Sequence, residues 1–257
     1  MISSEDMISS EEIQGNLYGL YEDMAASGLV SSGTAGGCRY IQYAGSAWPN
    51  MVYPGGSGAR PDIAMLVESV KARQCPRLVL FEEAMVTTEL VEEMNGFRFV
   101  PAAQWINMTL PLSESAGGYD RGQLECKVVD AGNPAEWKDW SSVAEEVLFK
   151  KEKLGADLFK YGCESGLFKL ITGYSGDQAV STTLLYRGRQ AGVYMVATLA
   201  AFQGKGLGKE LMGFTGSVAA AEGYSALVLH STKAGLRLYE SLGYRSKGKL
   251  LLYYCMA

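Results

Sequence analysis

The stretch "VATLAAFQGKGLGKELM", residues 196–212, is the most informative part of this sequence. An apolar run typical of a strand leads into three closely spaced glycines, Gly204, Gly206 and Gly208, and then into a run with helical periodicity. Glycines at such a turn let the backbone approach a phosphate group without obstruction by side chains. The free amides and the positive dipole end of a helix N-terminus suit the same anion. The stretch therefore predicts a phosphate-binding turn that opens a helix.

Two common phosphate-binding motifs do not fit this turn. The dinucleotide fingerprint G-x-G-x-x-G would need a third glycine at the position of Lys209. A Walker A loop needs Ser or Thr after Gly-Lys, but Glu210 follows here, so no hydroxyl is available for magnesium. The remaining pattern is Q-x-x-G-x-G, which runs from Gln203 through Gly206 to Gly208.

Composition limits the class of protein. The chain has 257 residues, of which 47% are hydrophobic and 20% charged, so it is globular and long enough for one large or two small domains. A net charge of −5 disfavours nucleic-acid binding. Five scattered cysteines and a single histidine disfavour disulfides and zinc, so no metal site is expected. No signal peptide or membrane-spanning run is predicted, which indicates a cytoplasmic protein without a membrane partner.

Local patterns predict the helices and strands. A capping box at residues 9–12 opens the first helix, and further helices are predicted at residues 61–74, 87–96, 150–161 and 234–243, after Asn133, and from the glycine turn to residue 221. Strands are predicted at residues 39–43, 51–53, 77–83, 126–131, 167–174, 178–188, 191–200 and 226–231. Residues 97–100 and 104–110 are predicted to form a strand pair, and a second strand pair is predicted to end at residue 255.

The two halves of the chain share an order of patterns. "RLVLFEE" precedes a helix and "EEMNGFRF" in the first half, and "ALVLHST" precedes a helix and "YESLGYRS" in the second. Both halves therefore place a Gly-aromatic-Arg step after a strand and a helix. We expect two similar α/β units, residues 1–112 and 124–257, joined by a polar, glycine-rich linker at residues 113–123.

The glycine turn resembles the acyl-CoA-binding motif [RQ]-x-x-G-x-[GA] of the GNAT acetyltransferase superfamily. The likeness continues, because residues 193–212 resemble the family's fourth strand and third helix, and "LYESLGYR" resembles its L-Y-E-x-x-G-[FY] segment. The resemblance covers roughly residues 126–257. It implies an α/β (α+β) fold class with two GNAT-like units, each a mixed central sheet flanked by helices.

The resemblance also implies acetyl-CoA as the cosubstrate. The backbone of Val196, Ala197 and Thr198 would pair with the pantetheine arm as an added strand would. The pyrophosphate would lie on the turn formed by Gln203, Gly204, Lys205, Gly206, Leu207 and Gly208. The alternative is a plain turn that follows buried strand residues.

Catalytic roles follow less directly. Tyr239 matches the family tyrosine that is proposed to protonate the departing sulfur of CoA, although it is also a candidate packing residue. The fourth strand has no Glu where many members carry a general base. His230, at the end of the next strand, is one candidate base, and a chain of waters is another. His230 is also a candidate strand-end hydrogen bonder. A backbone amide near residues 196–198 is the expected oxyanion donor.

The N-terminal half resembles a degenerate GNAT unit. It has Glu92 at the position equivalent to Tyr239, and its "PGGSGAR" loop lacks the full motif. We expect this half to cover the second unit and to shape the acceptor site, with Trp48, Glu82 and Glu83 as candidate wall residues.

The predicted function is transfer of an acetyl group from acetyl-CoA to a primary amine, by direct attack in a ternary complex. The expected partner is a small-molecule amine. One alternative is a non-catalytic acyl-CoA-binding sensor, which the presence of Tyr239 disfavours. Another is an acyltransferase for a longer acyl group, or for an amine on a protein or an aminoacyl-tRNA, and the acidic charge disfavours the tRNA version. The sequence does not indicate the acceptor or the oligomeric state.

Overall fold

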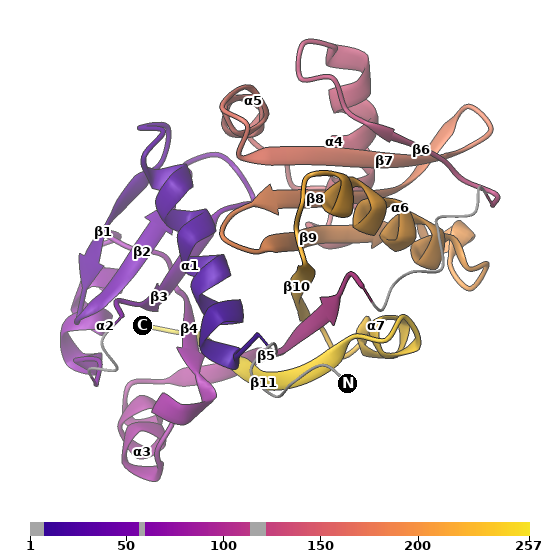
Figure 1. Cartoon of the computed structure of the whole chain (residues 1–257). Helices are drawn as coiled ribbons and strands as arrows, with labels where there is room; N and C mark the ends of the chain where they lie inside the picture. The colour runs from indigo at the N-terminus through magenta and orange to yellow at the C-terminus, as the bar shows by residue number, and fades with distance from the viewer. Residues whose placement is uncertain (1–7, 57–59, 114–121) are drawn as a thin grey trace.

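The computed structural model describes residues 8–56, 60–113 and 122–257 (Figure 1). The helices are α1 (Ser10–Ala25), α2 (Ile63–Lys71), α3 (Thr88–Gly96), α4 (Pro134–Leu148), α5 (Ala156–Glu164), α6 (Leu207–Ala221) and α7 (Leu236–Ser241), with short 3₁₀ turns η1 (Glu83–Met85) and η2 (Ala200–Phe202). The strands are β1 (Ser31–Ala35), β2 (Cys38–Gln42), β3 (Asn50–Pro54), β4 (Leu78–Glu82), β5 (Phe99–Pro111), β6 (Glu125–Val128), β7 (Phe168–Ser175), β8 (Gln178–Arg187), β9 (Ala191–Thr198), β10 (Ala226–Ser231) and β11 (Arg245–Cys255). Most of the predicted linker, residues 114–121, lies outside the described residues.

The described strands form one mixed sheet with helices on both faces. Its order is β1-β2-β3-β4-β11-β5-β10-β9-β8-β7-β6. Adjacent residues of a strand point to opposite faces, and the cores follow this rule. Leu184 of β8 packs in the core beneath α1, α4 and α5, whereas Leu185 packs in the core beneath α6 and α7. The predicted mixed sheet flanked by helices is confirmed.

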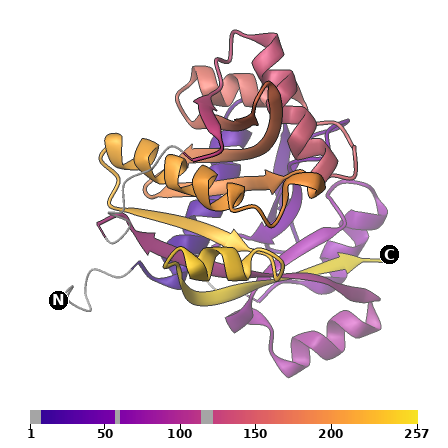
Figure 2. The ribbon, with the colours of Figure 1, turned by 90° about the vertical axis from the view of Figure 1, so that its right-hand side faces the viewer.

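The last strand of each half crosses into the other half of the sheet (Figure 1, Figure 2). β5 lies between β10 and β11, and β11 lies between β4 and β5. All of these pairings are antiparallel. The two predicted strand pairs are therefore wrong, because β5 and β11 are each one long strand. A register shift near Leu252, where Ala103 pairs with Leu252 and Pro101 with Tyr253, accommodates Pro101 within β5.

The halves repeat one order of elements. The first runs β1-β2-β3-α2-β4-α3-β5, and the second runs β7-β8-β9-α6-β10-α7-β11. In both halves a parallel pair, β3 with β4 and β9 with β10, flanks the helix connection. The boundaries of the two units remain a prediction, because β5 and β11 each belong to both halves of the sheet.

The caps predicted from sequence form as expected, but one helix begins later. Ser9 Oγ accepts from the Glu12 amide at 3.1 Å, and the Glu12 carboxylate accepts from the Ser9 amide at 2.9 Å. α5 begins at Ala156 rather than near residue 150, because Lys150 and Lys151 have φ values of 51° and 72°, which no α-helix allows. Strand β1, with four exposed small residues, had no alternating pattern to reveal it. None of the helices in the described ranges is long and apolar enough to cross a membrane.

The crossing strands predict that neither half folds alone. We expect a protein cut at a protease site placed between residues 114 and 121 to stay assembled and to unfold in one transition. We expect fragment 122–257 by itself to aggregate, because β10 and β11 would both expose the edges that β5 covers. Gel filtration and circular dichroism on the cut protein and on the fragment test this. A monomeric, cooperatively unfolding fragment 122–257 would contradict it.

Candidate functional site

The glycine turn connects the end of β9 to the start of α6 (Figure 1). Gly204 and Gly206 have φ values of 74° and 83°, in the left-handed region that glycine adopts without strain. Gly206 is the N-cap of α6, and it supplies no side-chain cap. Residues 203–206 are exposed at the surface. The turn therefore leaves the N-terminus of α6 open to solvent.

The amides at the glycine turn and at the first two positions of α6 have no backbone acceptor among the described residues. The amides of Lys209 and Glu210 bond to the Gly206 carbonyl at 2.9 and 3.2 Å. Within the described part of the chain, the amides of residues 204–208 make no such bond. Unpaired amides at a helix N-terminus attract an anion, and the helix dipole adds to the attraction. The predicted pyrophosphate position has the required donors.

The equivalent helix of the first half is closed to anions. At the N-terminus of α2, the Asp62 side chain accepts from the Met65 amide at 2.9 Å. A carboxylate at the N-cap fills the anion position and repels a further negative charge. The two helix starts thus differ, since Gly206 leaves its helix open and Asp62 closes its own.

Strand β9 separates from β10 next to the turn. The parallel pairing extends only from Ala191–Leu227 to Val193–Leu229. A bulge follows in β9, where Met195 has a φ of 51°. Beyond it, Val196 and Thr198 are half-buried and Ala197 is buried. These three predicted residues therefore lie on a strand edge that β10 no longer covers and that leads directly to the glycine turn.

A side-chain hydrogen bond of Gln203 connects the glycine turn to β9. Its side-chain nitrogen donates to the Thr198 carbonyl at 2.9 Å. Lys205 Nζ lies 4.9 Å from the centre of the Phe202 ring, a cation–π contact within the same turn. The Gln203 side chain thus links the glycine turn to the end of β9.

Tyr239 lies on α7, which packs against the start of α6. A Cβ atom at Gly208 would lie 3.2 Å from Leu238, so this glycine lets α7 come close to the turn. Tyr239 is 8% exposed, and its ring meets Tyr244 edge-on at 5.5 Å. Burial raises the pKa of the Tyr239 hydroxyl, so it stays protonated at neutral pH. The helix that carries this protonated hydroxyl thus packs beside the start of α6.

His230 lies on the other face of β10, away from Tyr239. Its Nδ1 is 2.8 Å from Asn107 Oδ1, and its ring lies between Trp105 and Tyr194. Because Asn107 Nδ2 donates to Ser10 Oγ, its Oδ1 accepts and His230 carries the proton on Nδ1. Burial lowers the pKa of His230 to about 3, with the backbone of Ile13 opposing. The Nε2 atom is enclosed and has no partner among the described residues.

The candidate wall residues have partners of their own. Trp48 packs between Tyr21 and Phe159, at ring distances of 6.5 and 5.6 Å. Glu82 accepts from the Tyr18 hydroxyl at 3.1 Å, and Glu83 pairs with Lys249 at 2.8 Å. No described contact joins these residues to the glycine turn.

Sequence reasoning missed two threonines of β8 at the bulge. Thr182 Oγ1 donates to the Met195 carbonyl at 3.3 Å, and Thr183 Oγ1 donates to the Tyr194 carbonyl at 3.2 Å. Both side chains are fully buried. No sequence signal marks them, because threonine is common in strands and the bulge itself has no motif.

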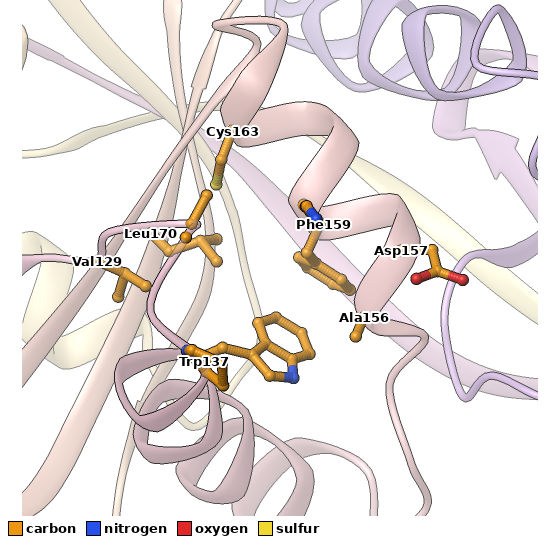
Figure 3. Close-up of a pocket in the computed structure, with 11 residues that line it drawn as sticks. Val129, Trp137, Ala156, Asp157, Phe159, Cys163 and Leu170 are labelled. Carbon is orange, nitrogen blue, oxygen red and sulfur yellow. The ribbon is translucent and has the colours of Figure 1, made fainter.

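Two hollows lie elsewhere on the C-terminal half. One, of about 210 Å³, lies between α4, α5 and β7, and Trp137, Phe159, Leu170 and Cys163 line it (Figure 3). The other, of about 310 Å³, is bordered by Asp139, Glu146, Asp177 and Leu199, among others. Neither contains a predicted site residue. Over the same described ranges, no group of three or more His, Cys, Asp or Glu side chains is placed to hold a metal ion.

Comparison with known proteins identifies the domain. Residues 141–251 match the family model of the acetyltransferase (GNAT) domain. A GCN5-related N-acetyltransferase from Kribbella flavida has a TM-score of 0.68 and 13% identity, over 94% of this chain and 95% of its own. A GCN5-related N-acetyltransferase from Sphaerobacter thermophilus has a TM-score of 0.58 and 15% identity, over 85% of this chain and 80% of its own. A tandem GNAT protein from the clavulanic acid biosynthesis pathway has a TM-score of 0.58 and 10% identity, over 84% of this chain and 77% of its own. No curated protein sequence matches the chain.

At such low identities the solved structures establish the fold, and the family model establishes the domain. The residues matched by the family model include the glycine turn and strands β9 and β10. The chain therefore has the GNAT fold and carries a GNAT acetyltransferase domain in its C-terminal half.

Proposed function

We propose that this chain is an N-acetyltransferase that moves an acetyl group from acetyl-CoA to a primary amine of a small molecule. The observation that carries the proposal is the open N-terminus of α6 directly after a strand edge that β10 has left uncovered. The amides of residues 204–208 would hold the pyrophosphate, and residues 196–198 would pair with the pantetheine arm. The capped helix α2 supports one cofactor site per chain.

The reaction needs a small set of groups. The neutral amine attacks the thioester carbonyl, a C–N bond forms, and the C–S bond breaks. Tyr239, whose hydroxyl stays protonated at neutral pH because burial raises its pKa, would give its proton to the departing sulfur. The attacking nitrogen loses one proton, so the proton count balances once solvent returns a proton to Tyr239. Backbone amides at the β9 bulge would stabilise the carbonyl oxygen.

We propose that water, rather than His230, removes the proton of the amine. A pKa near 3 makes the imidazole a weak base at neutral pH, and its free nitrogen is enclosed. These features support the role of a hydrogen bonder that holds Asn107 beneath α1. The five free cysteines support the cytoplasm as the location, because thiols persist in a reducing compartment.

Gly206→Ala tests the cofactor site. The substitution forces an L-residue into the left-handed region at the helix start, so we expect CoA affinity to fall about 10-fold or more. Calorimetry on the unmodified protein should give one site per chain. Gly176→Ala is the matched control, since Gly176 also has a positive φ and open space around its Cβ position. Two equivalent sites, or full affinity in Gly206→Ala, would refute the assignment.

Tyr239→Phe tests the proton donor. We expect kcat to fall by about 10²–10⁴, because one general acid is lost, while CoA affinity changes little. Tyr244→Phe serves as the control, since the Tyr244 hydroxyl is buried with no hydrogen-bond partner among the described residues and its ring touches Tyr239. Turnover in Tyr239→Phe equal to that of the control would reduce Tyr239 to a packing residue.

The buried imidazole predicts a pH-dependent stability. Unfolded histidine titrates near pH 6.5, whereas folded His230 titrates near 3. Between these values the unfolded state binds one more proton, so acid destabilises the folded protein. We expect a loss of about 1.5 kcal/mol between pH 6.5 and 5, before most carboxylates titrate. Urea unfolding should show this loss in the unmodified protein and not in His230→Gln.

The kinetic profile completes this test. If water removes the proton, the rise of kcat/KM with pH should reflect deprotonation of the acceptor amine. The pH at which kcat/KM rises should then shift with the basicity of that amine. A rise of kcat/KM between pH 6 and 7 that is the same for all acceptors and is lost in His230→Gln would instead show that His230 is the general base.

A further inference from the structure

The bulge in β9 is held in place by side chains of β8. Across this pair Thr182 lies opposite Ala197, and Leu184 lies opposite Tyr194. Thr183 therefore faces two residues of β9, Met195 and Val196, and Met195 takes up the extra length with its positive φ. A methionine in this conformation is strained, so neighbouring contacts must maintain it.

Two threonine hydroxyls form hydrogen bonds to the bulge from opposite faces of the sheet. Thr183 Oγ1 bonds the Tyr194 carbonyl at 3.2 Å, and Thr182 Oγ1 bonds the Met195 carbonyl at 3.3 Å. Consecutive strand residues point to opposite faces, so one hydroxyl reaches the bulge from each side. The Thr183 backbone is itself anchored, because Trp140 Nε1 donates to its carbonyl at 3.0 Å.

These bonds set the direction of two amides. Both carbonyls turn toward β8, and in a trans peptide the N–H of the following residue points the opposite way. The amides of Met195 and Val196 are therefore directed away from β8, toward the side where β10 has separated. Two successive amides that point into one space form a concave donor pair for an anionic oxygen.

We infer that Thr182 and Thr183 are positioning residues that hold the Met195 and Val196 amides in line for the thioester oxygen of acyl-CoA. The inference rests on the proposed function, and it names the parts of this chain that prepare its oxyanion site. In a regular strand, successive carbonyls point to opposite edges. Without the bulge, one of the two carbonyls would therefore point away from β8, and the amide that follows it would point toward β8.

Isosteric substitutions test the pair. We expect Thr182→Val/Thr183→Val to lower kcat about 10²-fold, because displaced donors no longer match the reacting oxygen. The KM for the amine and the affinity for adenosine 3′,5′-bisphosphate, which reaches only the glycine turn, should stay unchanged. The Thr182→Ser/Thr183→Ser protein keeps both hydroxyls and should recover most of the rate.

Thr109→Val is the matched control. Thr109 is also buried, and its hydroxyl bonds a strand carbonyl, that of Leu227, at 3.2 Å, away from the bulge. A lower kcat in the double valine variant with normal turnover in Thr109→Val would support the inference. Full turnover in the valine variant, or an equal loss in the control, would overturn it.

The ligand-free backbone gives a readout that does not need activity. Amide NMR shifts of residues 194–197 should change in the double valine variant and stay unchanged in Thr109→Val. If the unmodified protein acetylates no amine, the proposed function fails, and these shifts still decide whether the threonines hold the bulge. Unchanged shifts in the valine variant would refute the inference.

Discussion

The antiparallel ladder between β5 and β11 joins the two halves of the chain into one sheet. Each strand is paired on both edges, since β5 also pairs with β10 and β11 also pairs with β4. A strand inside a sheet hides edges that would otherwise attract other chains. The position of β10 thus depends on a strand from the first half. The opening between β9 and β10, on which the proposed chemistry rests, is framed by both halves.

Helix α1 adds a polar connection across the same junction. Asn16 Nδ2 donates to the Gln190 carbonyl, and the Tyr194 hydroxyl donates to Asn16. Further along the helix, Tyr186 donates to Asp23 at 2.6 Å, and Tyr18 donates to Glu82 in the first half. Partly buried hydrogen bonds of this kind favour one arrangement, because a shifted helix would leave polar groups unpaired. His230 bonds Asn107, which in turn donates to Ser10 at the start of α1, and burial at this place lowers the pKa of the imidazole.

Two backbone irregularities build the candidate site, and side chains act mainly by supporting them. The bulge at Met195 lies where β9 separates from β10, and Gly206 starts α6 without a side-chain cap. The corresponding helix of the first half begins with Asp62, whose carboxylate occupies the anion position. One fold thus yields an open and a closed helix start by the choice of a single N-cap residue.

The sequence determined the features that short segments control. Capping residues, apolar periodicity and glycines predicted most helices and strands, the glycine turn that opens α6, and the family, because these signals act within one or two turns of chain. Pairing across the sheet lay beyond such signals, so the crossing of β5 and β11 and their length as single strands were missed. The state of His230 also needed the tertiary structure. Its partner Asn107 is 123 residues away, and its lowered pKa comes from burial that residues distant in sequence create. The sequence named His230 as a candidate base, and only its surroundings decided how readily it holds a proton.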